Sequence, residues 1–535
     1  EIAQCLVGSE MCIRDRLKYN LIPKPNFYKT LDGTYTVSSG TKVLCAEEFL
    51  TAGNYLTAYL KTSPVSTEGA IKFKKVGGME PESYKLKVSP EGIFVEASDA
   101  RGAFYGAVTL KTILMQATKK EGKAVVNGLL IQDAPQYSYR GVQMDESRHF
   151  FGVKTVKQVL DMMAMLKLNT FHWHLSDDQG YRIESKVFPL LNSVGSTRKY
   201  AGLQGFGFKH RGGEYSHYYK QEEIREIVAY AKKLHITVIP EIDVPGHTLA
   251  MLAAYPELSC TGKKIEPACE NGILEDILCA GNEEVYTFLE KLFQELCSLF
   301  DGPYFHIGGD EAIKGHKLWE KCPKCTSVMQ AQNLKSAKEL QGYFMTRVNA
   351  ILKKYGKTCI AWNDCINDNF DSSIICQYWF PNNLAAVRKQ ASHRDFILSP
   401  ENYFYFDEKY ARVSLKKVYK FNEVKVGFAG VGQHVRGIEC EHWSEWIDTD
   451  SALQFAMFPR LFAVAEVGWT KLENRRYRDF YKRLAWYKTY LNKIGINYSR
   501  VEKGRAATRQ VIPYHFGADG KEYKKSEELK AKESF

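Results

Sequence analysis

Long stretches of uniform character are missing from this sequence of 535 residues. No run of Lys and Arg is long enough to follow a phosphate backbone, although the net charge is +11, so nucleic acid is not an expected partner. No stretch approaches the roughly 20 uncharged residues of a membrane-spanning helix, because the most apolar segment contains Pro459, Arg460 and Glu466. Hydrophobic residues still make up 44% of the chain, which excludes disorder as its main state. At roughly 100 to 200 residues per domain, we expect two to four folded domains without a membrane span.

Cysteine is present without a recognisable framework. The count of 13 is odd, and no two Cys-x-x-Cys pairs have the spacing of a zinc ribbon. Cys322-Pro-Lys-Cys325 is a single Cys-x-x-Cys, for which a loop disulfide or two free thiols are more typical than a metal site. Cys260 and Cys279 flank a long segment, where they form either a disulfide or two buried thiols. The sequence therefore predicts no metal and no cofactor.

The first 16 residues have no signal-peptide pattern, because they lack a basic start, an uninterrupted apolar run and a small-residue cleavage site. They also lack the periodicity of a helix or strand. We interpret residues 1–16 as a non-native leader and leave them out of the fold prediction. The compartment therefore has to be argued from other features of the chain.

Residues 17–135 have the pattern of a small α+β domain. Apolar residues alternate with polar ones over residues 84–88 and again over 93–97, with a Ser-Pro-Glu-Gly turn between them, which predicts a hairpin. Asp99 precedes a segment with apolar residues at helical spacing and is a typical N-cap for it. This region shows no cluster of reactive side chains.

Residues 136–495 follow a different pattern, in which short β-rich runs alternate with amphipathic segments. The predicted strands are 141–144, 170–175, 237–242, 304–307, 359–362, 374–378, 396–398 and 438–442. Eight parallel strands close a (β/α)8 TIM barrel, in which catalytic groups follow the carboxyl ends of the strands. The predicted outer helices include 282–300, 334–355 and 451–469, the last kinked at Pro459. The link between the fifth and sixth strands is too short for a full helix. Residues 496–535 are expected to be a solvated terminal helix or tail.

Reactive side chains follow every predicted strand. They include Asp145 and Arg148, His172, His174, Asp177 and Asp178, Glu241, Asp243 and His247, His306, Asp310 and Glu311, Trp362 and Asp364, Trp379, Tyr403, Tyr405 and Asp407, and Trp443 and Glu445. If the strands form a barrel, these carboxylates and rings converge at one end. Such a surface suits pyranose rings, which have apolar faces and hydroxyl rims.

The most distinctive local pattern is His306-Ile-Gly-Gly-Asp310-Glu311. Two glycines allow a tight turn that presents adjacent carboxylates. Because such carboxylates repel each other, one can stay ionised while the other is driven toward its protonated form, as a general acid requires. In isolation this string is more typical of a turn and a helix N-cap, but its place after the fourth barrel strand favours a catalytic pair.

This motif resembles the catalytic signature of the family 20 glycoside hydrolases, the exo-acting β-N-acetylhexosaminidases. The resemblance extends in family order over Asp133-Ala-Pro, Arg140-Gly, Asp145-Glu-Ser-Arg-His-Phe, His172-Trp-His-Leu-Ser-Asp-Asp-Gln-Gly, Glu241-Ile-Asp-Val-Pro-Gly-His, Tyr405-Phe-Asp and Trp443-Ser-Glu. It covers the whole predicted barrel. The small preceding domain resembles the α+β domain that usually accompanies this barrel.

The resemblance implies a substrate-assisted retaining hydrolysis that releases terminal N-acetylglucosamine or N-acetylgalactosamine from glycans through an oxazolinium intermediate. It implies that Glu311 is the acid and base, that Asp310 orients the 2-acetamido group, and that Tyr405 donates to its carbonyl oxygen. The residues implied in substrate binding are Arg148, Trp362, Trp379, Trp443, Asp407 and Glu445. The residues expected to support the catalytic pair are Asp177, His247 and His306. A periplasmic or secreted location fits a glycan substrate, and the sequence leaves open whether two barrels pair as a homodimer.

Two other functions are compatible with a barrel. A zinc-dependent amidohydrolase would use His172, His174, His247, His306 and Asp310 as ligands. A catalytically silent carbohydrate-binding protein could retain the same scaffold. Trp173, Asp177 and Asp178 fit the glycosidase pattern better than a zinc site, and a binding protein has no need of a paired acid and orienting carboxylate.

Overall fold

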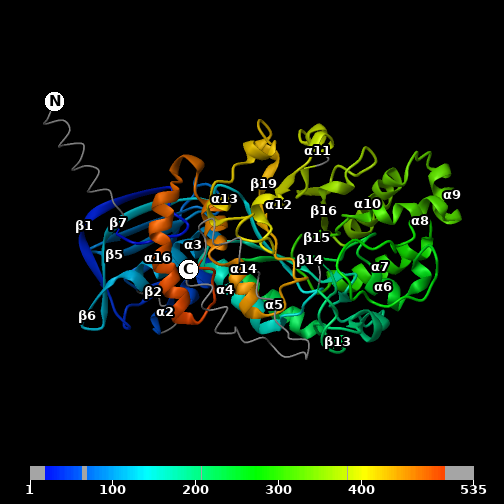
Figure 1. Cartoon of the computed structure of the whole chain (residues 1–535). Helices are drawn as coiled ribbons and strands as arrows, with labels where there is room; N and C mark the ends of the chain where they lie inside the picture. Colours follow the sequence, from blue (N-terminus) through cyan, green and yellow to red (C-terminus); the bar gives the residue numbers. More distant parts are fainter. Residues whose placement is uncertain (1–17, 63–68, 206–207, 382–383, 501–535) are drawn as a thin grey trace.

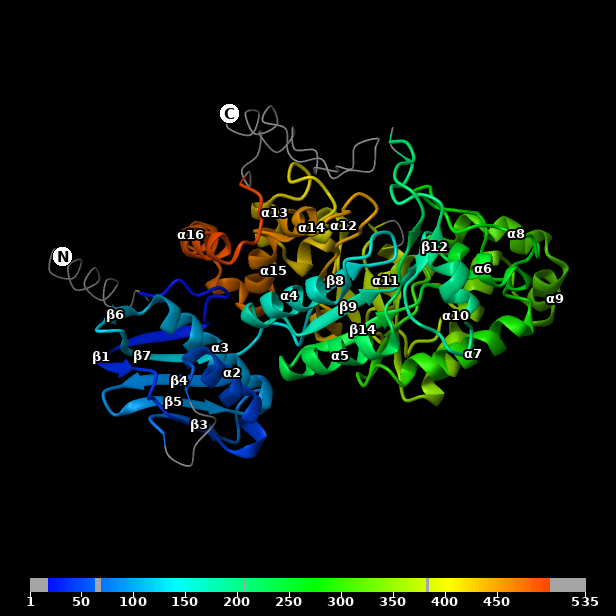
Figure 2. The same cartoon turned by 90° about the horizontal axis from the view of Figure 1, so that it is seen from below.

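The computed structural model describes residues 18–62, 69–205, 208–381 and 384–500. Figures 1 and 2 show an N-terminal sheet domain at one end of the molecule and a barrel beside it. The leader that we predict at residues 1–16 lies outside the described residues, as does most of the predicted C-terminal tail. Among the helices of the described part, none is long and apolar enough to cross a membrane.

The N-terminal domain is an α+β unit built on one mixed sheet. Its strand order is β1 (Phe27–Val37), β7 (Lys123–Asp133), β4 (Tyr84–Ser89), β5 (Gly92–Ala97), β3 (Ile71–Lys75) and β2 (Val43–Leu44), with β6 (Thr118–Lys120) beside β7. The predicted hairpin is confirmed, because β4 and β5 pair antiparallel from Tyr84 and Ala97 to Ser89 and Gly92. Helix α3 (Ala100–Gln116) packs on this hairpin and on α2 (Leu50–Leu60). Its N-cap is Asp99, which accepts a 2.8 Å hydrogen bond from the Gly102 amide.

The second domain is the predicted eight-stranded parallel barrel. The strands close in the order β14, β15, β16, β17, β18, β19, β8 and β9. Their bounds are β8 Tyr139–Asp145, β9 Thr170–His174, β14 Thr237–Glu241, β15 Tyr304–His306, β16 Thr358–Trp362, β17 Ile375–Tyr378, β18 Phe396–Leu398 and β19 Val435–Cys440. Short hairpins, β10 (Ser176–Asp177) with β11 (Gly180–Tyr181) and β12 (Thr197–Arg198) with β13 (Tyr215–Ser216), decorate the segment after β9.

Most barrel helices form where the apolar spacing predicts them. Helix α7 (Glu283–Cys297) starts after Asn282, whose side chain accepts from the Glu284 amide, and α10 (Ala337–Lys354) is capped by Ser336. The predicted helix over 451–469 is two helices, because Pro459 cannot donate a backbone hydrogen bond and separates α14 (Asp450–Met457) from α15 (Arg460–Trp469). The other helices are α4 Gly152–Met165, α5 Gln221–Lys233, α6 Leu249–Ala254, α8 His316–Lys321, α9 Pro323–Ala331, α11 Leu384–Gln390, α12 Glu401–Phe404, α13 Leu415–Tyr419 and α16 Tyr477–Ile494.

The link between β16 and β17 has no crossover α-helix. It contains only the short 3-10 helix η5 (Asn363–Cys365) among its turns. This confirms the irregular fifth unit expected from the short spacing, and it places Asp364 directly after β16.

Buried charges join the two domains. Asp133 at the end of β7 accepts hydrogen bonds from Tyr84 Oη and Trp469 Nε1, both at 2.8 Å, and lies 3.3 Å from Lys167 Nζ. Arg140 in β8 reaches back to the N-terminal domain, where it donates to Tyr105 Oη at 2.9 Å. Since these groups are buried, each has to find its partner across the junction.

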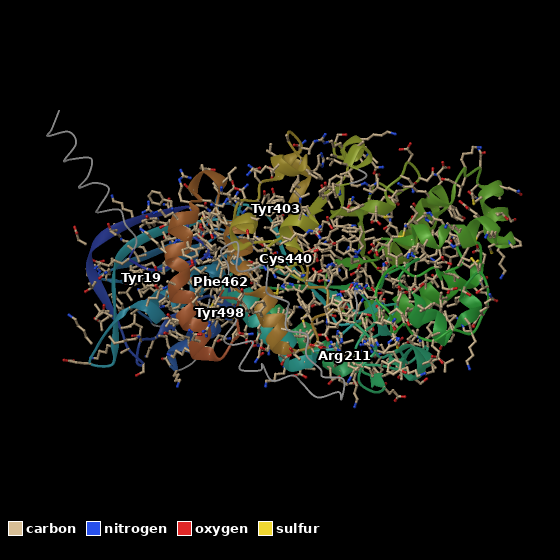
Figure 3. The ribbon with its side chains drawn as sticks, viewed as in Figure 1. Tyr19, Arg211, Tyr403, Cys440, Phe462 and Tyr498 are labelled. Atoms are coloured by element: carbon tan, nitrogen blue, oxygen red, sulfur yellow. The ribbon has the colours of Figure 1, made fainter. Side chains whose placement is uncertain are left out.

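Helix α16 covers the same junction. The Phe462 ring of α15 lies beside α16 in Figure 3 and packs on Tyr487, with ring centroids 4.9 Å apart. Tyr487 Oη accepts from the Ile22 amide at 2.7 Å, so α16 also binds the segment that leads into the first sheet. The hydrogen bond between Ile22 and Tyr487 thus joins a segment near the start of the described chain to a helix near its end.

Candidate active site

The site starts from the register of the barrel strands. Asp145 pairs with His174, His174 with Glu241, and Glu241 with His306, so the last residues of β8, β9, β14 and β15 lie in one row. Parallel strands present their carboxyl ends at the same rim of a barrel. The loops that follow these four strands therefore meet at one end of the molecule.

Glu241 is the central anion beneath this rim. Trp362 Nε1 donates to its carboxylate at 2.9 Å, His306 Nδ1 and His172 Nε2 lie 2.8 and 3.1 Å from it, and His174 Nδ1 is also in contact. Burial alone would raise the pKa of Glu241, but the surrounding histidines hold it well below its usual range. Burial opposes protonation of His174, yet the adjacent Glu241 raises its pKa to about 9, so this histidine is a cation at neutral pH.

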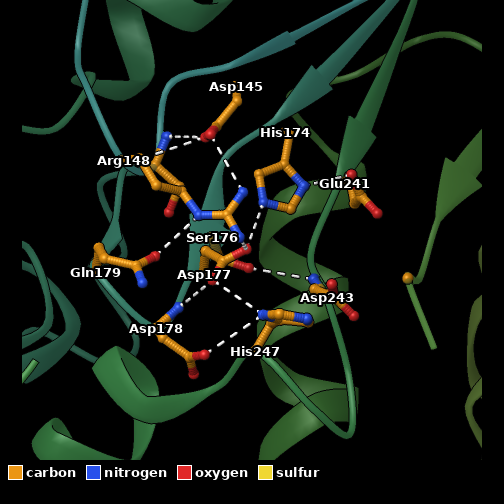
Figure 4. Close-up of polar contacts among 12 residues, drawn as sticks. Asp145, Arg148, His174, Ser176, Asp177, Asp178, Gln179, Glu241, Asp243 and His247 are labelled. Carbon is orange, nitrogen blue, oxygen red and sulfur yellow. Dashed lines mark hydrogen bonds and ion pairs between the residues drawn. The ribbon is translucent and has the colours of Figure 1, made fainter. Parts of the chain in front are cut away.

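Figure 4 shows polar contacts that run from Arg148 through Asp177 to His247. Asp177 Oδ2 lies 2.7 Å from Arg148 Nη2, and Asp177 Oδ1 lies 3.1 Å from His247 Nδ1. On its other side, His247 Nε2 lies 3.7 Å from Asp310 Oδ2 and 3.4 Å from Glu311 Oε2. The predicted supporting residues Asp177 and His247 therefore lie in a continuous line with the two carboxylates.

His247 carries positive charge at the centre of this line. Burial would lower its pKa, but Asp177, Asp178 and Glu311 raise it well above the usual range. Burial would raise the pKa of Asp177, whereas Arg148 and His247 keep it well below its usual range. His247 is therefore an imidazolium paired with the Asp177 carboxylate, and its positive charge faces Asp310 and Glu311.

Arg148 is fixed in a single orientation by its neighbours. Its guanidinium donates to Gln179 Oε1 at 2.8 Å and to Asp145 Oδ2 at 3.2 Å (Figure 4). It also lies over the Trp443 ring, 5.3 Å from the ring centroid. Its Nη2 is 3.9 Å from Glu445 Oε1. A planar donor fork held in this way is preorganised for an oxygen-rich ligand.

The turn that carries Asp310 and Glu311 needs the two preceding glycines. Gly308 and Gly309 have φ of +59° and +96°, and a Cβ on Gly308 would come within 1.7 Å of Asp243 Oδ1. The Gly309 amide donates to the same Asp243 oxygen at 3.0 Å. Glu311 has φ of +50°, and its amide donates to Asp364 Oδ2 at 2.8 Å. Two carboxylates from neighbouring strands thus bind the backbone of this turn.

The same carboxylates crowd Asp310 electrostatically. Burial and the adjacent Asp243 raise the pKa of Asp310 well above its usual range, and His247 opposes the shift. Asp243 responds in the same direction, since burial and the nearby anions raise its pKa as well. Burial raises the pKa of Asp364 to about 6. The region around the turn therefore holds protons at a pH where isolated carboxylates are ionised.

Aromatic rings stand opposite the turn. Trp379 and Tyr405 are parallel within 9°, with centroids 5.9 Å apart, and Trp443 is 6.2 Å from Tyr405. Trp379 Nε1 donates to Asp364 Oδ1 at 3.2 Å, so the ring and the turn share one anchor. Trp362 is fully buried, and its ring centroid is 5.9 Å from that of Trp443.

The structure brings the predicted residues together with two differences in depth. Trp362 and His306 belong to the buried layer around Glu241, whereas Glu311 retains 32% side-chain exposure. Asp407 is partly buried, and desolvation together with the nearby Glu445 raises its pKa well above the usual range. Sequence reasoning assigned no role to Glu241, Asp243 or Asp364, although each follows or ends a predicted strand.

The predicted amidohydrolase ligands do not form one cluster. Among the described residues, His172 and His306 can share an ion with Glu241, while His247 and Asp310 group with Asp243. The two sets lie in different layers of the site. The five-ligand zinc site of this alternative function is therefore not formed among the described residues.

Barrel, carboxylate pair and aromatic wall together define a glycoside hydrolase. Residues 137–472 match the catalytic domain of glycosyl hydrolase family 20, and residues 18–134 match domain 2 of the same family. The chain therefore belongs to glycosyl hydrolase family 20, which confirms the resemblance seen in the motifs.

Relatives and solved structures agree with this family. The chain is 34% identical over 509 residues to a beta-hexosaminidase of Porphyromonas gingivalis, a match covering 90% of this chain and 64% of that protein. A GH20 exo beta-N-acetylglucosaminidase from Vibrio harveyi, solved with N-acetylglucosamine, has a TM-score of 0.81 at 31% identity, covering 91% and 79% of the two chains. A beta-N-acetylhexosaminidase from Bacteroides fragilis also has a TM-score of 0.81, at 28% identity, covering 93% and 100%.

Proposed function

We propose that this chain is an exo-acting β-N-acetylhexosaminidase that releases terminal N-acetylglucosamine or N-acetylgalactosamine from glycans. One observation carries the proposal: Asp310 and Glu311 are adjacent on a positive-φ turn, and His247 Nε2 approaches both carboxylates, at 3.7 and 3.4 Å. One of these two adjacent carboxylates can act as the acid while its neighbour faces the substrate's amide group. They suit a reaction in which the substrate provides its own nucleophile.

In the first step, the carbonyl oxygen of the substrate's 2-acetamido group attacks C1, and the bond from C1 to the leaving oxygen breaks. Glu311 gives its proton to that oxygen. Asp310 accepts the amide N–H and stabilises the positive charge of the oxazolinium ring, and Tyr405 donates to the attacking carbonyl oxygen. In the second step, Glu311 takes a proton from water, the water oxygen adds to C1, and the ring opens with retained configuration.

The remaining predicted residues recognise the sugar. Arg148, Asp407 and Glu445 bind the hydroxyls remote from C1, for which the held guanidinium fork and its neighbouring carboxyls provide donors and acceptors. Trp379 and Trp443 enclose the ring and the N-acetyl methyl group, with Trp362 as the floor below. Asp177, His247 and His306 keep the carboxylates in place and tune their charge.

An aryl β-N-acetylglucosaminide and the matching aryl β-glucoside test the mechanism. The glucoside lacks the internal nucleophile, so we expect release of the aryl group from the acetamido sugar and almost none from the glucoside. Equal rates would require a nucleophile on the protein, with Glu445 as the candidate, and would refute the proposed mechanism. No release from either substrate would favour the catalytically silent sugar-binding protein.

Two further predictions concern the location and the oligomeric state of the protein. A glycan substrate fits export to the periplasm or the medium, which cell fractionation tests. A homodimer of barrels is tested by light scattering on the purified chain.

A further inference from the structure

Four cysteines from separate parts of the chain meet outside the catalytic region. Cys260 follows the 3-10 helix η3 (Pro256–Leu258), Cys279 precedes α7, Cys322 is the N-cap of α9, and Cys325 lies in its first turn. Their sulfur atoms all lie within 4.8 Å of one another. This cluster corrects the sequence interpretation, which treated Cys260 with Cys279 and Cys322 with Cys325 as two unrelated pairs.

The distances between the sulfurs do not fit disulfides. Cys279 Sγ is 3.6 Å from Cys325 Sγ and 3.7 Å from Cys322 Sγ, and Cys260 Sγ is 3.8 Å from Cys325 Sγ. A disulfide joins sulfurs at about 2.0 Å. A tetrahedral zinc ion with Zn–S bonds of about 2.3 Å separates its sulfur ligands by about 3.8 Å. Three of the six sulfur–sulfur separations, at 3.6 to 3.8 Å, match the edges of such a tetrahedron, and the other three are no longer than 4.8 Å.

The surroundings of the cluster are built for a closed site. Cys279, Cys322 and Cys325 are buried, while Cys260 is partly exposed. A Cβ on Gly281 would come within 2.2 Å of the Lys324 carbonyl carbon, so only glycine lets this segment approach the Cys-x-x-Cys turn so closely.

We propose that Cys260, Cys279, Cys322 and Cys325 bind one zinc ion in a closed structural site. Four thiolates leave no open position for substrate, which distinguishes this site from a catalytic zinc. Its two halves come from the loop after β14 and from the α8–α9 segment that follows Glu311. The site therefore joins the loop that carries His247 to the loop that carries the predicted acid.

Other contacts reinforce the same junction. Trp319 Nε1 of α8 donates to the Leu278 carbonyl at 2.9 Å, and Lys314 Nζ donates to the Ile273 carbonyl at 2.7 Å. Figures 1 and 2 show α8 and α9 at the end of the molecule opposite the N-terminal sheet. Since α8 and α9 lie far from the N-terminal domain, a metal ion at this end can stabilise a region that the other domain does not reach. The inference does not depend on the proposed activity.

Metal analysis of the purified full-length chain tests the proposal. The protein is prepared with a reductant, and zinc is measured before and after incubation with zinc chloride followed by desalting. We expect about one tightly held zinc per chain. Titration with a mercurial thiol reagent should release it as four thiols react. Cobalt substituted for zinc should show the visible bands of a tetrahedral thiolate site.

Cys325→Ser should lose the zinc and have a lower melting temperature. Cys297→Ser changes a partly exposed cysteine outside the cluster, and it should keep the zinc and the melting temperature of the unchanged chain. The wild-type measurements decide the matter even if the Cys325 variant does not fold. A reconstituted wild-type chain that holds no zinc would overturn the proposal. Peptide mapping under non-reducing conditions that finds a disulfide within the cluster would do the same.

Discussion

At the scale of single residues, the site depends on one protonated histidine between carboxylates. His247 is tied to Asp177 on one side and faces Asp310 and Glu311 on the other. Asp310 can stabilise an oxazolinium ring only when it is ionised, yet burial and Asp243 favour its protonated form. The cation on His247 is what shifts Asp310 back toward the carboxylate.

Replacing the proposed acid should separate chemistry from binding. We expect Glu311→Gln to lower kcat by about 10²- to 10⁴-fold for an alkyl leaving group, because the leaving oxygen is no longer protonated. A phenol of low pKa leaves without that proton, so the rate of the first step should fall far less for an aryl substrate. Values of kcat/KM across a series of leaving groups, which report on the first step alone, measure the difference. A uniform loss across the series would contradict the role of Glu311 as an acid.

The pH profile should report on His247. The pKa of Asp310 is already raised, and His247→Asn removes the cation that opposes this shift, so the pKa rises further. Activity is lost as pH falls through the pKa of Asp310, and the acidic limb of kcat should therefore move to higher pH in the variant. His434→Asn, a change at a partly exposed histidine beside Asp395, should leave the limb in place. An unchanged limb in His247→Asn would refute this electrostatic role.

At the scale of secondary-structure elements, the decisive piece is the turn after β15. It is held from both sides, by Asp243 after β14 and by Asp364 after β16, through the amides of Gly309 and Glu311. The short link after β16 contributes here, because η5 places Asp364 immediately beyond the strand. An irregular unit of the barrel thus supports the turn that carries the proposed catalytic pair.

Gly308→Ala should damage this turn selectively. A Cβ there would collide with Asp243 Oδ1 in a left-handed backbone conformation, so the turn has to move, and the proposed catalytic pair moves with it. We expect a loss of kcat of about 100-fold or more, since misplacement by about 1 Å costs that much. Gly356→Ala is the matched control: its φ is +71°, and nothing lies within 4 Å of the added Cβ. It should lose some stability, about 1–2 kcal/mol, and little activity. Equal kcat in both variants would show that the turn tolerates the displacement.

At the scale of the whole molecule, the two domains are joined by buried polar groups as well as by apolar packing. Asp133 collects contacts from Tyr84 in its own domain and from Lys167 and Trp469 in the barrel. Burial lowers the pKa of Lys167 to about 8, while Asp133 favours its charged form. Loss of Asp133 would leave that amine buried without its carboxylate.

We therefore expect Asp133→Ala to lower the free energy of unfolding by about 3–5 kcal/mol, the usual cost of breaking a buried ion pair. Chemical denaturation followed by fluorescence measures the change. Asp368→Ala removes the partner of Lys389 from a pair whose side chains are 80% and 68% exposed. That control should leave stability almost unchanged. Similar effects of both changes would mean that the junction does not depend on Asp133.

Much of the architecture could be predicted because its signals are local. Apolar alternation located the hairpin of β4 and β5, Asp99 and Asn282 marked helix starts, and eight β-rich runs indicated a barrel. Pro459 was expected to kink a helix, and the chain instead forms two helices at that point. Helical spacing continued across the proline, so periodicity alone could not show the break.

The site divides in the same way. Parallel strands bring the polar residues that follow their ends to one rim. The sequence itself therefore determined which side chains gather there. Which of them touch depends on loops of unequal length that fold back from different strands. The contacts of Asp243 with Gly309, of Asp177 with His247, and of Cys260 with Cys325 join residues far apart in the chain. No local spacing encodes such distances, and only the tertiary structure decided them, because they arise when the closed barrel holds its loops together.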